Sequence, residues 1–371
     1  RWETSSEWNL GWNIGFFDDL ITADINLYNK KQTDLLTENA PIPSTTGFST
    51  LLVENGGDML NKGYEINLNL NRVKIVGDLA ATFNFTFANN RNTITAMDPT
   101  RLAAMNGTGV KLPRNGEYMT RIQIDNPFGA IYGLRYKGVY AYSYDQFGKA
   151  QEAGASCPVA RDEKGEVIYG ADGTPMQMYY DYNGTKYAFT GGDAIYEDVN
   201  HDGSIDQYDV VYLGSSLPKL TGGFGLRLMY KGWSLNAQFN YRYGNKIANV
   251  ARMNAENMHG ADNQSTAVNY RWRKEGDGAD GGHILPRALY NAGYNHMGSD
   301  RFVEDGSFLR LNYLQLSYSF APKLIKRIGF ERLNFYLSGE NLFCLTKYSG
   351  VDPEVNYGGM GVTMDKAITP R

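Results

Sequence analysis

Apolar side chains recur at every second position in several long stretches of this sequence, and this spacing constrains the fold more than any other feature. In the first stretch, Trp8, Leu10, Trp12, Ile14 and Phe16 share one parity, whereas asparagine and glycine occupy the other. A period of two is typical of a β-strand, because successive side chains point to opposite faces of a sheet. The pattern therefore predicts strands with one apolar face and one polar face.

The same alternation recurs along the chain. It predicts strands at residues 8–17, 21–30, 62–71, 78–89, 220–230, 233–244, 306–321 and 333–344. In the stretch 306–321 the apolar parity changes before Leu314, and we expect a β-bulge there, because one extra residue restores the facing of the side chains.

These strands are too long and their polar face is too weakly charged for an ordinary soluble sheet. Soluble strands usually have about 5 or 6 residues, and the polar face here carries mainly Asn, Thr, Ser and Gln instead of Lys and Glu. A tilted strand crosses a bilayer in about 9 to 11 residues, with apolar side chains toward lipid and small polar ones toward the lumen. We therefore predict an all-β fold, an antiparallel transmembrane β-barrel.

The connections between the expected strands alternate between short and long. The short links are residues 18–20, 73–77, 230–233 and 321–332, and the long ones cover about 31–61, 90–218, 246–300 and 345 onward. Short turns of outer-membrane barrels face the periplasm and long loops face the exterior. The strand at 8–17 is therefore expected to run toward the periplasm, and each following strand is expected to run opposite to the one before it. Residues 127–143 form either a further span or an extracellular hairpin.

The expected strands leave the sheet open after its last upward strand. Unpaired backbone groups that face lipid cost several kcal/mol each, so an open edge is not stable in a membrane. We expect residues 1–371 to be the carboxy-terminal portion of a larger barrel, with the remaining strands, including the last one, outside this chain.

The composition supports a β-rich protein and excludes several classes. The chain has 371 residues with 27 Tyr and 42 Gly, and only 20% of its residues are charged. The formal net charge of -4 provides no basic surface for nucleic acid. Its 2 cysteines suggest neither a disulfide framework nor a zinc cluster, and no apolar run approaches the roughly 18 residues of a membrane helix.

The stretch DVNHDGSIDQYD, residues 198–209, has the spacing of a calcium-binding loop. Gly203 is expected to make the turn and Ile205 to anchor the loop inward. The flanking residues have strand and turn chemistry instead of the two helices of an EF-hand. A turn that binds no metal is the alternative, because Asp and Asn also stabilise turns. The expected calcium ligands are Asp198, Asn200, Asp202, Ser204, Asp206 and Asp209.

Several blocks in order along the chain resemble the SusC/RagA family of TonB-dependent transporters of Bacteroidetes. They include RWETSSEWNLGWNIGFF, NGGDMLNKGYEINL, SFLRLNYLQLSYSF and LNFYLSGENLF, together with the long block that begins at Asp198. The resemblance implies a location in the outer membrane and a barrel of about 22 strands with an amino-terminal plug. Neither the plug nor the TonB-contacting segment is expected in this chain.

The resemblance also implies function and partners. It implies import of oligosaccharides or peptides, driven through TonB, by a transporter paired with a SusD-like lipoprotein, and it allows a dimer of such pairs. The expected surroundings are outer-membrane lipid, with no nucleic acid and no enzymatic activity. The alternative is a calcium-dependent surface adhesin or carbohydrate-binding β-protein, for which the strands should be short and the exterior polar.

The loop residues offer no catalytic motif. The chain has 4 histidines, at 201, 259, 283 and 296, and we expect all of them at the surface without catalytic partners. Tyrosines of the long loops either stack on a solute or serve as interfacial and packing residues, and the second role is favoured for any single one. These tyrosines are Tyr140, Tyr142, Tyr144, Tyr179, Tyr180 and Tyr182. The substrate ligands are not predicted.

Overall fold

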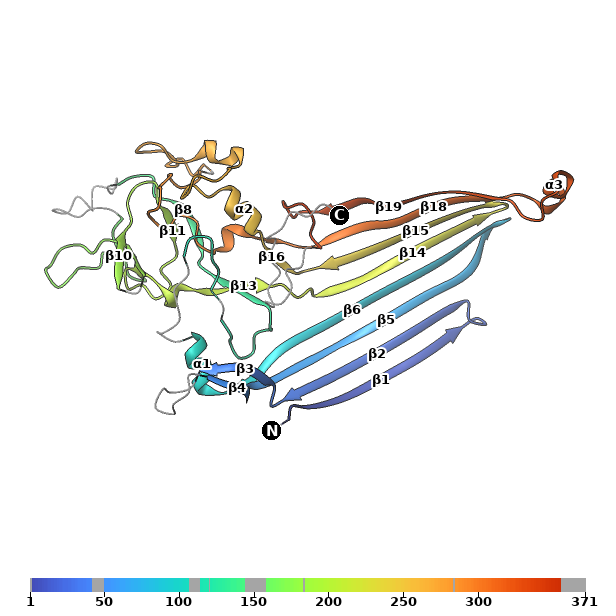
Figure 1. Ribbon diagram of the computed structural model, residues 1–371, viewed down its shortest axis with the longest axis horizontal. Helices are drawn as coiled ribbons and strands as arrows, with labels where there is room; N and C mark the ends of the chain where they lie inside the picture. The colour runs from blue at the N-terminus through green and yellow to red at the C-terminus, as the bar shows by residue number, and fades with distance from the viewer. Residues whose placement is uncertain are drawn as a thin grey trace.

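One long antiparallel sheet dominates the computed structural model of the chain (Figure 1). The structure describes residues 2–41, 50–106, 114–119, 121–143, 158–182, 184–282 and 284–354. The strands follow the order β1-β2-β5-β6-β14-β15-β18-β19, so that each strand pairs with its predecessor in this series. Their bounds are Thr4–Phe16, Ile21–Thr33, Gly57–Val76, Leu79–Met97, Leu220–Tyr230, Trp233–Tyr243, Phe308–Ser319 and Asn334–Thr346.

The observed bounds confirm each of the expected strands, and β5 and β6 extend beyond the predicted ends. Figure 1 shows the short turns gathered at one end of the sheet, where the helix α3, Pro322–Ile325, also lies. The long connections leave from the opposite end. Alternating short and long links therefore predicted correctly that successive strands reverse and that the short turns share one end of the sheet.

The pairing register places the apolar residues of all eight strands on one face. One apolar row crosses the entire sheet from β1 to β19, through Ile14, Ala23, Leu68, Phe85, Phe224, Phe239, Leu311 and Phe343. The adjacent row on the opposite face contains Asn13, Asp24, Asn67, Thr86, Gly223, Asn240, Arg310 and Cys344. Because a register slip of one residue would exchange the two faces, these rows fix the register strongly.

The apolar face is open along much of the sheet. Trp8 is 56% exposed, Leu68 38% and Leu337 77%, and no other sheet or helix of the described residues covers this face as a second layer. In water such a surface would be unfavourable by about 25 cal/mol for each Å², whereas hydrocarbon accommodates it. The structure therefore agrees with strands that face lipid on one side.

The expected β-bulge is present. Gln238 pairs with Tyr313 and Phe239 with Leu311, so Asn312 is the extra residue of β18. The bulge keeps Leu311 and Leu314 on the same face although three positions separate them. The change of parity in the sequence was therefore a reliable indication of the bulge.

A close approach of backbones inside the sheet depends on Gly222 of β14. A Cβ atom there would collide with the carbonyl oxygen of Thr86 and lie 2.7 Å from the hydroxyl of Tyr241. Tyr241 crosses this space and donates a hydrogen bond of 3.1 Å to the same carbonyl. The tyrosine thus covers the side of the sheet that the glycine leaves bare.

The long connections form a compact loop module, which we define as residues 114–143, 158–218 and 246–305, excluding the undescribed positions. Its elements are β7 (Ala130–Gly133), β8 (Tyr136–Val139), β9 (Tyr179–Tyr182), β10 (Thr185–Ala188), β11 (Ala194–Tyr196), β12 (Ser204–Ile205), β13 (Val211–Ser215), β16 (Lys246–Ala248), α2 (Val250–Ala255) and β17 (Val303–Asp305). Residues 127–143 contribute β7 and β8, which pair with β13 and β11 and not with the long sheet. This segment is therefore an extramembrane part of the fold and not a span.

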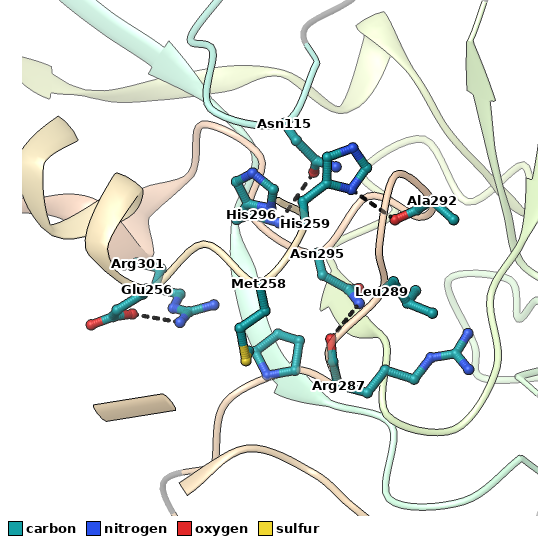
Figure 2. Close-up of a pocket in the computed structure, with 11 residues that line it drawn as sticks. Asn115, Glu256, Met258, His259, Arg287, Leu289, Ala292, Asn295, His296 and Arg301 are labelled. Atoms are coloured by element: carbon teal, nitrogen blue, oxygen red, sulfur yellow. Dashed lines mark hydrogen bonds and ion pairs between the residues drawn. The ribbon is translucent and has the colours of Figure 1, made fainter. Parts of the chain in front are cut away.

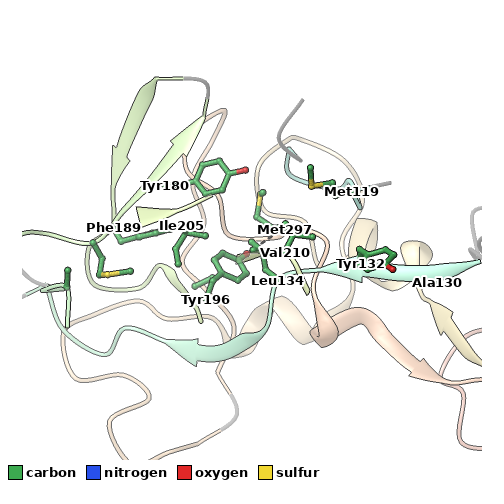
Figure 3. Close-up of a cluster of buried hydrophobic side chains, with 13 residues drawn as sticks. Met119, Ala130, Tyr132, Leu134, Tyr180, Phe189, Tyr196, Ile205, Val210 and Met297 are labelled. Carbon is green, nitrogen blue, oxygen red and sulfur yellow. Dashed lines mark hydrogen bonds between the residues drawn. The ribbon is translucent and has the colours of Figure 1, made fainter. Parts of the chain in front are cut away.

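The loop module has its own hydrophobic core (Figure 3). Tyr180, Phe189, Ile205 and Met297 are fully buried in it although they come from distant parts of the chain. Outside the module, β3 (Leu36–Pro41) and β4 (Thr50–Asn55) form a hairpin, and α1 spans Pro99–Asn106. The module gives the loop end of the sheet a rigid surface that can carry binding sites.

None of the helices in the described ranges combines the length and the apolar character needed to cross a membrane.

Candidate functional site

The loop 198–209 lies inside the module, between β11 and β13. Gly203 has φ +84, a conformation that favours glycine, and a Cβ there would meet Met176 at 2.7 Å. Ile205 is fully buried, which confirms its role as the inward anchor. Ser204 and Ile205 form β12, which pairs in parallel with β9. The loop is thus held by strand pairing and by the module core, and not by two helices.

All six expected ligands lie in this loop, but the side chains of the four aspartates and of Asn200 bond to the loop itself. Asp198 accepts N–H groups from Asp202 at 3.2 Å and from Gly203 at 2.8 Å. Ser204 and Tyr208 donate their N–H groups to Asp202 at 2.8 Å and to Asp206 at 2.7 Å. In addition, Asn200 donates to Asp202 at 2.9 Å.

Asp209 is the most buried carboxylate of the loop. It is fully buried and accepts N–H groups from Val199 at 2.7 Å and from Asp206 at 2.8 Å. Burial, together with the nearby charges of Asp198 and Asp206, raises the pKa of Asp209 to about 7. No Lys or Arg side chain of the described residues forms an ion pair with it.

The donor set of the loop fits calcium in its chemistry, because hard cations prefer carboxylate and carbonyl oxygens. Its arrangement fits less well. Across the ranges that the structure describes, no group of three or more His, Cys, Asp or Glu side chains is placed to hold a metal ion. The structure brings the predicted residues into one loop but does not make them converge on one point.

A second candidate site is an open pocket of about 480 Å³ in the loop module. Its wall combines the segment at 114–115, the β9–β10 hairpin, residues 257–259 and residues 291–296. Figure 2 shows a smaller hollow in which Asn115, His259 and His296 lie together, and these three residues also line the larger pocket. The cationic and aromatic residues of the wall include Arg114, Tyr182, Lys186, Tyr187, His259 and Tyr294.

Tyrosine rings form one side of the pocket. Tyr294 lies 6.4 Å from Tyr182 in a stacked arrangement, 5.6 Å from Tyr187 edge to face and 4.1 Å from Tyr180, measured between ring centroids. Tyr180 is buried in the module core. The core therefore fixes the rings that line the pocket, and this arrangement suits stacking on a ring or on an apolar side chain.

A buried ion pair positions Tyr187. Its hydroxyl donates to Asp193 at 3.0 Å, and Arg287 donates to the same Asp193 at 2.8 Å. Asp193 is fully buried and also accepts the amide of Asn295 at 3.2 Å. Burial and the charge of Asp193 raise the pKa of Tyr187 to about 12, so its hydroxyl is neutral at ordinary pH.

His296 lines the inner part of the pocket wall and corrects one expectation. It is buried, not at the surface, because the module core closes around residues 294–297. Burial, together with the nearby His259 and Arg301, lowers the pKa of His296 to about 4. His259 lies 5.7 Å away between ring centroids and has its Nδ1 3.1 Å from the carbonyl oxygen of Ala292. His283 and Tyr144 lie outside the described residues.

Tyr180 and Tyr182 are among the loop tyrosines that the sequence singles out, but no pattern in the sequence indicates the pocket. Tyr180 packs in the core, as expected for a single loop tyrosine, whereas Tyr182 lines the pocket. Arg114, Tyr187 and Tyr294 come from three distant segments. No local pattern could have joined them, because only tertiary packing brings them together.

Comparison with known proteins agrees with this architecture. Residues 1–156 match the family model described as "TonB dependent receptor-like, beta-barrel". TonB-dependent receptor P3 of Formosa agariphila is 28% identical over 358 residues, which cover 96% of this chain and 31% of the relative. TonB-dependent receptor SusC of Bacteroides thetaiotaomicron is 24% identical, with 96% and 30% covered. The chain thus spans about a third of the length of these curated relatives.

Solved structures show the same fold. The structure of the RagAB peptide transporter superposes with a TM-score of 0.64 at 23% identity, covering 97% of this chain and 33% of that one. The RagAB peptide importer in its "open-open" state gives a TM-score of 0.61 at 22% identity, with 98% and 33% covered. Together with the long two-faced sheet, these findings show that the chain shares the fold of these outer-membrane β-barrels. Residues 1–156 match the TonB-dependent receptor barrel model, and the chain is similar to SusC over nearly its whole length.

Proposed function

We propose that the protein imports nutrients across the outer membrane in a TonB-dependent manner. The observation that carries this proposal is the sheet with an open apolar face and a polar face of Asn, Thr and Arg, joined at its loop end to a folded module with a pocket. A large barrel with such walls encloses a wet lumen. The module is then positioned to capture a solute before it enters the lumen.

We propose oligosaccharides or peptides as the substrates and a SusD-like lipoprotein as the partner, with a dimer of such pairs as the assembly. The similarity to a receptor named SusC supports the first substrate class, and the similarity to a structure described as a peptide transporter supports the second. Contact with TonB would occur through a part of the protein other than residues 1–371. Transport, not catalysis, is the proposed activity.

We propose that these strands form part of a barrel of about 22 strands that also holds a plug. In the described part of the chain, β1 and β19 each pair with one neighbour and leave an edge open. Because an open edge is unstable in hydrocarbon, further strands would have to cover both. The plug and the closing strands would lie elsewhere in the protein.

We also propose that Ca²⁺ binds the loop 198–209 and rigidifies it. Support comes from its oxygen donors and from the buried carboxylate of Asp209, which has only N–H partners and like charges around it. Binding would require Asp202 and Asp206 to turn away from the N–H groups of Ser204 and Tyr208. The proposed role is structural.

Uptake measurements test the import proposal. Cells that lack the gene should fail to take up at least one labelled oligosaccharide or peptide mixture that wild-type cells accumulate, and the intact gene should restore uptake. A protonophore should stop accumulation but not surface binding. If deletion changes surface binding of glycans and leaves uptake of every mixture intact, the importer is excluded in favour of an adhesin. The observed strands of 11 to 20 residues and the apolar exterior already disfavour that alternative.

A further inference from the structure

The pocket of about 480 Å³ has cationic residues in its wall but no carboxylate. We propose that this pocket binds the carboxylate-bearing end of the solute, either the free carboxyl terminus of a peptide or a uronic acid residue of an oligosaccharide. The inference rests on the proposed import function and names the chemistry of the substrate. A pocket of this size falls within the range of about 300 to 1,000 Å³ typical of small-ligand sites.

The cations of the pocket differ from the inner arginines of the module. Arg252, Arg287 and Arg301 each form an ion pair with a buried carboxylate at 2.6 to 2.8 Å. Within the described residues, Arg114 and Lys186 form no such pair. Their charges are therefore available to an anion that enters from solution.

Two carboxylates lie near these cations, and both are engaged elsewhere. Glu117 accepts the backbone N–H of Arg114 at 3.3 Å instead of its guanidinium. Asp181 accepts the backbone N–H of Gly184 at 2.7 Å. Neither lines the pocket. A ligand carboxylate would thus meet the guanidinium of Arg114, with the charge of Lys186 elsewhere in the wall and no competing protein anion there.

Tyrosine rings position the cations. Arg114 donates from Nε to the hydroxyl of Tyr182 at 2.7 Å, and its guanidinium carbon lies 5.4 Å from the centre of that ring. Lys186 Nζ lies 4.1 Å from the centre of the Tyr179 ring. A guanidinium has about five N–H donors, so the Nη groups of Arg114 stay free for a bidentate bond to a carboxylate.

The aromatic side of the pocket suits the part of the solute next to its carboxylate. Tyr182, Tyr187 and Tyr294 present stacked and edge-on rings close to Arg114. Such rings stack on the apolar face of a sugar or cover the side chain of a terminal amino acid. Charge and stacking together predict preference for an acidic oligomer over a neutral one of the same shape.

Binding calorimetry on the full-length purified transporter tests this inference, with probe pairs that differ only in charge. One pair is a galacturonic acid trisaccharide and its methyl ester, and the other is a tripeptide and its carboxyl-terminal amide. We expect the acid of at least one pair to bind about tenfold or more tightly than its neutral form. The double variant Arg114→Gln with Lys186→Gln should abolish that difference. Lys164→Gln, an exposed lysine outside the pocket wall, is the control and should keep the difference.

The pair in which the acid binds more tightly identifies the source of the carboxylate, either a uronic acid or the carboxyl terminus of a peptide. The inference is overturned if neither acid binds better than its neutral partner, or if the double variant keeps the preference. Because both substituted side chains are exposed, circular dichroism should show unchanged folding of the variant. Uptake of labelled neutral oligomers separates the import proposal from the pocket proposal. If uptake continues but acids bind no better than neutral forms, only the pocket proposal is overturned. If acids bind better but no oligomer is taken up, only the import proposal is overturned.

Discussion

At the scale of single residues, the fold controls the protonation of Asp209 more than that of its neighbours in the loop. The pKa of this carboxyl is about 7 instead of 3.8, because the side chain is buried beside other acidic residues. An acid with a raised pKa stabilises the fold at low pH and loses this contribution as the pH rises through about 7. A bound divalent cation would remove the penalty above that pH.

We therefore expect Ca²⁺ to slow amide exchange at Val199, Asp202 and Gly203 at pH 8. These N–H groups bond to Asp209 and Asp198, and a bound ion would fix those carboxylates. Hydrogen exchange with mass spectrometry, with and without calcium, measures the effect. Asp209→Asn should eliminate it, whereas Asp172→Asn, in an exposed hairpin, should not. Equal exchange rates in calcium and in chelator would reject the calcium proposal.

His296 should lower the stability of the module at acid pH, whereas Asp209 lowers the stability of the fold at higher pH. Its pKa is lowered from 6.5 to about 4, so its contribution to stability is present above about 6.5 and is lost as the pH falls toward 4. The shift corresponds to at most about 3 kcal/mol. Exchange protection of Gly116, which donates to the His296 carbonyl at 3.0 Å, should fall over this range after correction for intrinsic rates.

A matched pair of variants assigns that acid sensitivity. His296→Gln cannot gain a charge and should show a flatter dependence of protection on pH, while His201→Gln, at the tip of the loop 198–209, should behave like the wild type. An identical pH profile for His296→Gln would show that other groups cause the loss.

Residue patterns in the sequence predicted the loop better than the pocket. The loop is a single continuous segment, so the spacing of its residues was enough to predict the turn at Gly203 and to select six residues with oxygen donors. Contacts in the pocket join Arg114 to Tyr182 and Tyr182 to Tyr294 across long separations. Burial of His296 likewise depends on a core built from several segments and has no local signature.

At the scale of elements, alternation predicted the strands because a single physical requirement fixes each one. Every strand must present apolar side chains to one environment and polar ones to another, and a period of two records that requirement. The ends of β5 and β6 were predicted less well. These strands continue beyond the apolar run, to Gly57 and Met97, where backbone pairing persists without a lipid-facing pattern.

One pair of adjacent substitutions in β5 tests the two faces. Leu68→Arg places a charge on the apolar face, and we expect it to lower the free energy of unfolding in lipid vesicles by about 2 to 4 kcal/mol. Asn67→Arg places the same side chain on the polar face beside Asp24, its partner in β2, and should cost less than about 1 kcal/mol. Urea titration in vesicles measures both. Equal costs would contradict the assignment of the faces.

At the scale of the whole molecule, the structure combines a membrane sheet with a loop module that folds around its own core. The sequence indicated long loops but not their compactness, because the core residues are separated by more than a hundred positions, as Met119 and Met297 are. The arrangement explains how long connections can carry a defined pocket. In the proposed transporter, such a module above the sheet would hold a solute at the entrance of the lumen.

The proposed import function depends on a sheet that contacts lipid with one face and water with the other. Nitroxide labels placed singly at residues 223–228 of β14, in the full-length protein without its native cysteines and reconstituted in bilayers, distinguish the two faces. Power saturation should show oxygen accessibility high at Phe224, Leu226 and Leu228, and high accessibility to a water-soluble nickel reagent at the positions between them. Uniform accessibility along these residues, or the reversed phase, would show that the sheet does not separate lipid from a wet lumen.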